Sequence, residues 1–207
     1  MPVVSEERFN SAETYAQVRE RIVANGGRIL TALEAGERAA AAANPDFSAF
    51  ASLSEPVKML VISEDWCGDC TDNLPILNRI ATETGKLDFR VFARDENLDL
   101  ADQFLKEGKY RSIPVIVVLD KNLDPVSHVI ERPDTVTVLR LKKRQELHEA
   151  HPELGGFATP PDQLSDEVRD ARVKAEAATK AETAPWSVEE VVRWLSNALS
   201  PATAATA

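Results

Sequence analysis

Hydrophobic positions in the first quarter of the chain recur every three or four residues, which is typical of helices packed on one side. The stripe formed by Tyr15, Val18, Ile22 and Val23 predicts a first helix, with Ser11 as its N-cap and Gly26-Gly27 as its end. Residues 28–43 are rich in alanine and predict a second helix. This second helix is weakly apolar, so we expect it to pack on the side of a larger core.

Short apolar runs then predict a sheet. KMLVIS (58–63), LDFRVFA (87–93) and PVIVVLD (114–120) favour buried strands, separated by predicted helices at 70–84 and 98–108. The turn KNLDP joins the third run to VSHVIER (126–132), which favours a hairpin, and a further helix follows from Pro133. Strands joined through helices should be parallel, and the hairpin adds an antiparallel edge. The predicted class is α/β, with a mixed four-stranded sheet flanked by helices.

The last quarter of the chain is more polar. We expect a connector at 152–161, an exposed or partly disordered helix at 162–184, and a capping box at Ser187–Glu190 that opens a final helix at 188–199. The apolar stripe of that last helix (Val188, Val191, Val192, Leu195) should dock on the core. The chain is therefore divided into an N-terminal helical extension (1–56), a core domain (57–151) and a C-terminal extension (152–207).

Charge and cysteine content narrow the function classes. The formal charge of −10 and the pI near 4.9 argue against nucleic acid or anionic membranes as partners. The N-terminus lacks the pattern of a signal peptide, and the longest apolar stretch, 114–119, is too short to cross a bilayer. Both cysteines lie in one tetrapeptide, so no disulfide framework is expected. These features predict a cytoplasmic protein whose thiols are kept reduced.

The stretch EDWCGDCTD (64–72) carries the candidate chemistry. Cys67 falls where a predicted strand meets a helix, and the free N–H groups at a helix start lower the pKa of a thiol. Cys70 is one turn further and can attack a mixed disulfide formed on Cys67. Trp66 is placed to cover one side of the sulfur. The pair is therefore predicted to be a nucleophile and its resolving thiol.

Four features together resemble the thioredoxin superfamily: LVIS leading into WCGDC, Pro75 within the following helix, the dipeptide Ile113-Pro114, and the β-α-β-α-β-β-α order. The resemblance implies a thioredoxin fold with extra terminal helices, Cys67 as the nucleophile and Cys70 as the resolving thiol. It also implies a cis Ile113–Pro114 bond beside the cysteines, with Ile113 and Pro114 positioning the substrate. The sequences WCGDC, RDE (94–96), RSIP (111–114) and ERP (131–133) are similar to a bacterial group of uncharacterised thioredoxin-like proteins.

That resemblance implies a thiol-disulfide oxidoreductase. Its partners would be a disulfide-containing protein or small molecule and an external thiol reductant, and no metal or organic cofactor is implied. This sequence departs from thioredoxin proper at Asp69, where the family has proline, and at Val61 and Val91, which replace a buried aspartate and lysine. The family's glycine beside the cis-proline is replaced by the Glu131-Arg132 region.

The acids around the thiols predict a modest reactivity. A carboxylate about 6 Å from a thiolate costs on the order of 2 to 3 kcal/mol before screening, against roughly 1 kcal/mol from the helix dipole. We therefore expect Asp69 and Asp72 to limit the lowering of the Cys67 pKa and to make the couple reducing. Arg132 or Arg111 are candidates to counter them.

Other interpretations of the pair stay open. A glutaredoxin-like enzyme linked to glutathione would need a groove for the tripeptide's carboxylates and amine. A non-catalytic module would use the terminal helices to bind a partner and the thiols only to sense redox state. Two buried structural cysteines, or a zinc site completed by His148 and His151, are the remaining alternatives.

Overall fold

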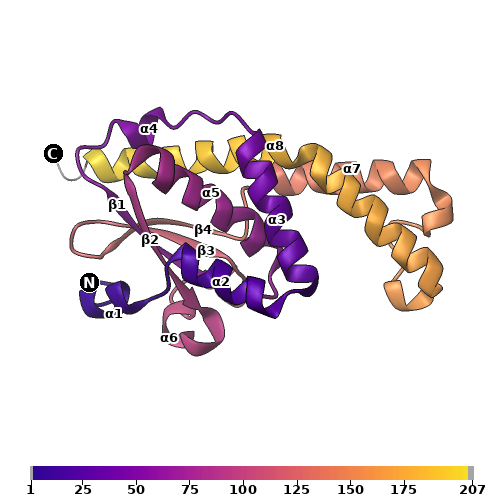
Figure 1. The fold of residues 1–207 in the computed structure, drawn as a ribbon, viewed down its shortest axis with the longest axis horizontal. Helices are drawn as coiled ribbons and strands as arrows, with labels where there is room; N and C mark the ends of the chain where they lie inside the picture. The colour runs from indigo at the N-terminus through magenta and orange to yellow at the C-terminus, as the bar shows by residue number, and fades with distance from the viewer. Residues whose placement is uncertain (1, 205–207) are drawn as a thin grey trace.

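The computed structural model describes residues 2–204, which form one mixed sheet enclosed by helices (Figure 1). The four strands are β1 (Val57–Ser63), β2 (Leu87–Ala93), β3 (Val115–Leu119) and β4 (Pro125–Ile130), in the order β2-β1-β3-β4. Strands β1 and β2 are parallel and are joined through α5 (Gly68–Thr84). The predicted α/β class with a four-stranded mixed sheet is confirmed.

Strand β3 runs antiparallel to β1, so the prediction that every strand joined through a helix lies parallel was wrong. The reason is that residues 94–114 never return along the sheet. They stay at the carboxyl end of β1 and β2, and β3 therefore starts beside the end of β1, with Val115 paired to Ile62. This reversal brings the segment before β3 next to the segment after β1. Strand β4 is antiparallel to β3, as predicted for a hairpin.

Both faces of the sheet are covered. Successive residues of β1 point to opposite faces, and all four of Met59, Leu60, Val61 and Ile62 are fully buried. One face packs against α3 (Gly27–Ala42), α5 and α8 (Asp166–Ala204), and the other against the N-terminal segment and α6 (Leu98–Ala101) (Figure 1). Burial on both faces explains why the central strands β1 and β3 are continuous apolar runs, whereas the edge strand β4 has no buried residue.

The N-terminal helices differ in detail from the prediction. Helix α2 (Tyr15–Asn25) is capped by Thr14, which forms a capping box with Gln17, whereas Ser11 ends a separate helix α1 (Glu6–Ser11). Gly26 ends α2 with a φ of 64°, as expected, and α3 follows. Helix α1 was not predicted, because its one apolar residue, the buried Phe9, lies among polar and charged residues and gives no periodic pattern. A short α4 (Ser48–Ala51) precedes the sheet.

The helix predicted at 98–108 is a single turn, α6, preceded by the 3₁₀ turn η1 (Arg94–Glu96). After α6 the chain reverses: Lys106 N–H donates to Tyr110 C=O, and Gly108 has a φ of 67°. Leu100 and Phe104 are buried although the helix ends early. The tight turn at 106–110 redirects the chain towards the start of β3.

The C-terminal region forms a helical hairpin of α7 (Asp134–Ala150) and α8, linked by the 3₁₀ turns η2 (Pro152–Leu154) and η3 (Pro161–Gln163). The hairpin protrudes from one end of the sheet, and α8 bends before its second half lies across the domain (Figure 1). Pro185 lies inside α8, and proline is an ordinary cause of helix bending.

The predicted break at residue 187 was wrong, because α8 is continuous for 39 residues. Ser187 does not cap a helix: its hydroxyl donates to Thr183 C=O at 2.9 Å, and Glu190 accepts instead from Thr135 at 2.7 Å. The predicted docking of the last helix is confirmed, since Val188, Val191, Val192 and Leu195 are buried in the core. Within residues 2–204, no helix is both long enough and apolar enough to cross a membrane.

Candidate active site

The two thiols lie at the junction between the end of β1 and the start of α5. Cys67 is the N-cap of α5, and its Sγ accepts the Cys70 backbone N–H at 3.2 Å. Its thiol also lies 3.6 Å from the Ile113 carbonyl oxygen, to which it donates. The Ile113–Pro114 peptide bond is cis. The structure thus brings together Cys67, Cys70, Ile113 and Pro114, because the C-terminal end of β1 lies beside the start of β3.

The two cysteines are in the free dithiol form and are not equivalent. Hydrogen bonds from the Cys70 side chain and backbone stabilise the Cys67 thiolate and lower the pKa of Cys67, against burial and the charge of Asp69. Burial is the largest cause that raises the pKa of Cys70 well above its ordinary value, followed by its interaction with Cys67. At a pH between the two pKa values, Cys67 is a thiolate and Cys70 remains protonated.

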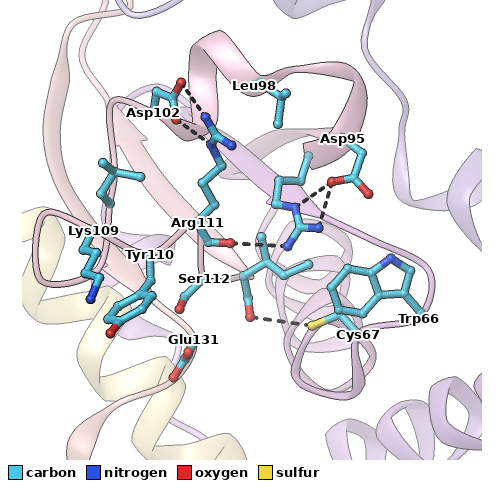
Figure 2. A pocket seen from close by; sticks show the side chains of 13 residues that line it. Trp66, Cys67, Asp95, Leu98, Asp102, Lys109, Tyr110, Arg111, Ser112 and Glu131 are labelled. Carbon is cyan, nitrogen blue, oxygen red and sulfur yellow. Dashed lines mark hydrogen bonds and ion pairs between the residues drawn. The ribbon is translucent and has the colours of Figure 1, made fainter.

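Cys67 opens onto a groove of about 780 Å³ (Figure 2). Its walls come from the β1–α5 turn, from α6, and from residues 109–113 before β3. Arg111 lies along it and pairs with Asp102 at 2.5 Å, while Lys109, Tyr110 and Glu131 lie across from the sulfur (Figure 2). The volume of the groove is in the range of small-molecule sites, and the Cys67 side chain, which is 7% exposed, is part of its lining.

Trp66 stands beside Cys67 at the edge of the groove (Figure 2). Its side chain is 61% exposed, and the Arg94 guanidinium lies 4.9 Å from its ring centre. Arg94 is held in turn by Asp95 at 2.7 Å. Trp66 therefore offers an exposed aromatic surface beside Cys67, with a cation against its ring.

Every acid in EDWCGDCTD has a partner. Asp69 pairs with Arg132 and with Arg140 (3.3 Å), and Asp72 pairs with Arg140 (3.1 Å) and Lys180 (2.7 Å). Of the other two acids, Asp65 pairs with Arg21, and Glu64 accepts the Asp95 N–H at 2.8 Å.

Neither Asp69 nor Asp72 lines the groove at Cys67. We call the set Asp69, Asp72, Arg132, Arg140 and Lys180 the α5–α7–α8 charge network.

Sequence reasoning identified Arg132 and the two aspartates but missed Arg140 and Lys180. Both are contributed by the C-terminal hairpin, from positions 68 and 108 residues after Asp72. No local spacing links such distant residues. Arg111, the other candidate to counter the acids, pairs with Asp102 instead. Asn73 was also missed: its amide donates to the backbone carbonyls of Asp69 (2.9 Å) and Glu131 (3.2 Å).

Glu131 occupies the backbone position beside the cis-proline. Its N–H donates to the Pro114 carbonyl at 2.7 Å, and its φ of 67° lies in the left-handed region that favours glycine. The Glu131 carboxylate accepts from Lys106 at 2.7 Å and lines the groove. A glutamate side chain therefore fills space at the groove that glycine would leave open.

The zinc alternative has no support in the geometry. His148 is buried, with Nδ1 bonded to the Gly155 carbonyl at 2.7 Å and Nε2 to Glu176 at 2.9 Å. His151 is exposed and pairs with Glu153. Over residues 2–204, no group of three or more histidine, cysteine or acidic side chains is arranged to hold a metal ion.

The family model Thioredoxin_9, described as thioredoxin, matches residues 13–146. The chain belongs to this thioredoxin family. The match begins at residue 13, so it includes α2 and α3 as well as the sheet. No curated protein matches the sequence.

Among solved structures, an HIV epitope scaffold is similar, with a TM-score of 0.61, 14% identity, and coverage of 95% of this chain and 98% of the other. A protein of unknown function from Pseudomonas aeruginosa, PA1234, gives a TM-score of 0.40 at 17% identity, covering 87% of this chain and 82% of the other. At 14% identity, the similarity to the epitope scaffold concerns the fold alone.

Proposed function

We propose that this member of the thioredoxin family is a thiol-disulfide oxidoreductase that reduces protein or small-molecule disulfides. The observation that carries the proposal is the asymmetry of the pair. Cys67, which is 7% exposed, lines the groove with its sulfur held by the start of α5, while Cys70, which is 1% exposed, lies one turn behind it and does not line the groove. A nucleophile needs access and a stabilised thiolate, and a resolving thiol needs proximity and protection from solvent.

The proposed reaction has two thiol-disulfide exchanges. The Cys67 thiolate attacks one sulfur of the substrate disulfide, the substrate S–S bond breaks, and the second substrate sulfur leaves as a thiolate that takes a proton. Cys70 then loses its proton and attacks the Cys67 sulfur, which releases the first substrate sulfur as a thiol. The protein ends with a Cys67–Cys70 disulfide and has given two electrons to the substrate. An external thiol reductant of the cytoplasm restores the dithiol.

The groove residues have positioning roles in this proposal. The substrate chain would lie beside Ile113 and Pro114, whose segment meets Cys67 at the Ile113 carbonyl. Trp66 would cover the substrate side of the mixed disulfide with its exposed ring. The open form of the groove favours a disulfide carried on an extended segment.

The charge network has a tuning role. Asp69 opposes ionisation of Cys67, and Arg132 and Arg140 offset its charge through direct ion pairs. Asp72 is offset in the same way by Arg140 and Lys180. The acids predicted from the sequence to restrain the thiolate are therefore balanced by Arg132, just before α7, and by Arg140 and Lys180 of the C-terminal hairpin.

The decisive experiment is reduction of insulin with dithiothreitol as the electron source, using the wild-type chain and the Cys67→Ser and Cys70→Ser variants. Wild type should turn over, and Cys67→Ser should not. Cys70→Ser should accumulate a mixed disulfide on Cys67, identified by mass spectrometry before and after reduction. Circular dichroism of each variant establishes that it is folded.

Absence of turnover by folded wild type, together with no mixed disulfide on Cys70→Ser, would exclude the reductase. Turnover that requires glutathione and is not supported by dithiothreitol would instead favour the glutaredoxin-like enzyme. Reversible oxidation of the pair without turnover of any disulfide would favour a redox-sensing module.

A further inference from the structure

A second cavity lies on the side of α5 away from the thiol groove. It has a volume of about 570 Å³ and is lined by residues of α3, α5, α7 and α8, which are labelled in Figure 1. Its size is in the range of small-molecule sites, which are commonly about 300 to 1,000 Å³. None of its lining residues is a cysteine, so the thiol chemistry does not account for it.

Alanine is the commonest residue on its two long walls, with four of the eight lining residues of α3 and three of the eight of α8. On α3 the lining residues recur from Arg28 to Ala42, which corresponds to about 20 Å of helix at 1.5 Å per residue. On α8 they recur from Ala177 to Val191. The short side chains keep the two helices from filling the space between them, although Gly36 lets α3 approach α5 closely at Thr71. The result is an elongated apolar space rather than a compact one.

The charges on the lining are unlike those of the whole chain. Five cationic side chains line the cavity (Arg28, Arg38, Arg132, Arg140, Lys180) and only two carboxylates, Asp69 and Asp72, in a protein with a formal charge of −10. Arg28 and Arg38 form no ion pair with a described residue. An elongated apolar space with a surplus of positive charge is complementary to a molecule with an alkyl chain and one anionic end.

We propose that this cavity binds a single-chain amphipathic carboxylate of the fatty-acid type. Its alkyl chain would lie along the alanine walls of α3 and α8, and its carboxylate would meet the arginines. The chain gains free energy by leaving water in proportion to its apolar area, and the carboxylate is held by charge-assisted hydrogen bonds. The site is separate from the thiol groove, and neither cysteine takes part.

The test is isothermal titration calorimetry of the full-length Cys67→Ser/Cys70→Ser protein with dodecanoate and octanoate below their aggregation limits. The absence of thiols separates this result from the outcome of the redox assays. We expect saturable binding of one molecule per chain, with octanoate weaker because it buries fewer methylene groups. Dodecanol, which has the same chain without the charge, should bind about tenfold more weakly or worse.

Two variants locate the site. Ala181→Leu places a larger side chain on the exposed α8 wall, and we expect loss of dodecanoate binding with an unchanged melting temperature. Arg140→Gln should lower the affinity for dodecanoate by about tenfold and leave the affinity for dodecanol unchanged. Arg169→Gln, a cation of α8 outside the cavity, is the matched control and should bind like the parent.

No saturable binding of dodecanoate would overturn the proposal, as would equal affinity for dodecanol or full binding by folded Ala181→Leu. A second copy of the chain is the competing occupant. A dimer in sedimentation that Ala181→Leu converts to a monomer would show that the cavity face is a protein interface, and would also overturn the proposal.

Discussion

Arg140 of α7 forms an ion pair at 3.3 Å with Asp69 of α5. Asp69 is two residues after the proposed nucleophile, Cys67. Both side chains are largely removed from solvent, with 17% and 23% of their surface exposed. Ion pairs of this kind are screened less than exposed ones. The C-terminal hairpin therefore contributes charge to the first turn of the helix that carries the thiols, although it is remote from them in sequence.

Arg140→Gln should raise the pKa of Cys67. Asp69 already opposes ionisation of Cys67, and loss of one of its two cations leaves more of that charge uncompensated. The alkylation profile of Cys67 should therefore move to higher pH. Asp69→Asn should shift the pKa in the opposite direction. The measurement is the pH dependence of iodoacetamide alkylation at Cys67, followed by peptide mass spectrometry.

The wild-type profile gives the baseline for both variants. Because the Cys67 pKa is lowered, its alkylation should persist at pH values below those of an ordinary thiol, while Cys70 stays unmodified. Arg169→Gln, which removes an exposed cation at the far end of α8, should leave the profile unchanged. An unchanged Cys67 profile in folded Arg140→Gln would show that the network does not tune the thiol.

Gly36→Ala should destabilise the fold. A Cβ at this position would lie 2.2 Å from the Thr71 carbonyl oxygen, which is backbone of α5 and cannot rotate away. The two helices must separate, and overpacking of this kind costs about 1–3 kcal/mol. Gly68→Ala is the matched control, because nothing lies within 4 Å of its added Cβ. Urea unfolding should show a lower free energy of unfolding for Gly36→Ala alone, and equal values for both variants would contradict the close approach.

Glu176 should make the stability of the hairpin sensitive to acid. Burial alone would raise its pKa, but hydrogen bonds from His148, Arg144 and Arg172 outweigh burial and lower the pKa from 4.5 to about 2. A carboxylate whose pKa is lower in the folded state stabilises the fold above its unfolded pKa, and this contribution is lost as pH falls from about 4.5 towards 2.

Glu176→Gln should therefore lower the free energy of unfolding at neutral pH by on the order of 1–2 kcal/mol after solvent screening. The difference from wild type should disappear near pH 2. Glu153→Gln, at an exposed acid paired with His151, is the control and should have a much smaller effect. Urea unfolding at several pH values measures both. A constant difference across the acid range would mean that Glu176 acts through packing and not through its charge.

The sequence predicted the parts of this molecule whose signals are local. Periodicity placed β2 at its observed bounds, and the Cys67–Cys70 spacing at a strand-to-helix junction located the candidate site. It failed where distant contacts decide the structure. Ser187 and Glu190 match a capping box, but burial of the α8 stripe and the Glu190–Thr135 bond keep the helix continuous. Arg140, one of the two cations that pair with Asp69, comes from α7, and no local spacing in the sequence reveals that contact.

Glu131→Gly should widen the range of disulfides that are reduced. The Glu131 side chain lines the groove beside the cis-proline segment, and its backbone holds a φ that glycine adopts without strain. Removing the side chain opens space next to Pro114 and relieves the left-handed conformation, while it gives up the pair with Lys106. We expect a several-fold rise in kcat/KM for insulin, a bulky substrate, and little change for a small aromatic disulfide.

Lys106→Ala separates these two effects, because it removes the same ion pair but leaves the glutamate in the groove. Its ratio of insulin to small-disulfide rates should stay at the wild-type value. A parallel rise for both substrates in Glu131→Gly would point to a change in the thiol and not in access, and the Cys67 alkylation profile of that variant would reveal it. Equal ratios in wild type and in Glu131→Gly, with unchanged thiol pKa, would show that Glu131 does not restrict the groove.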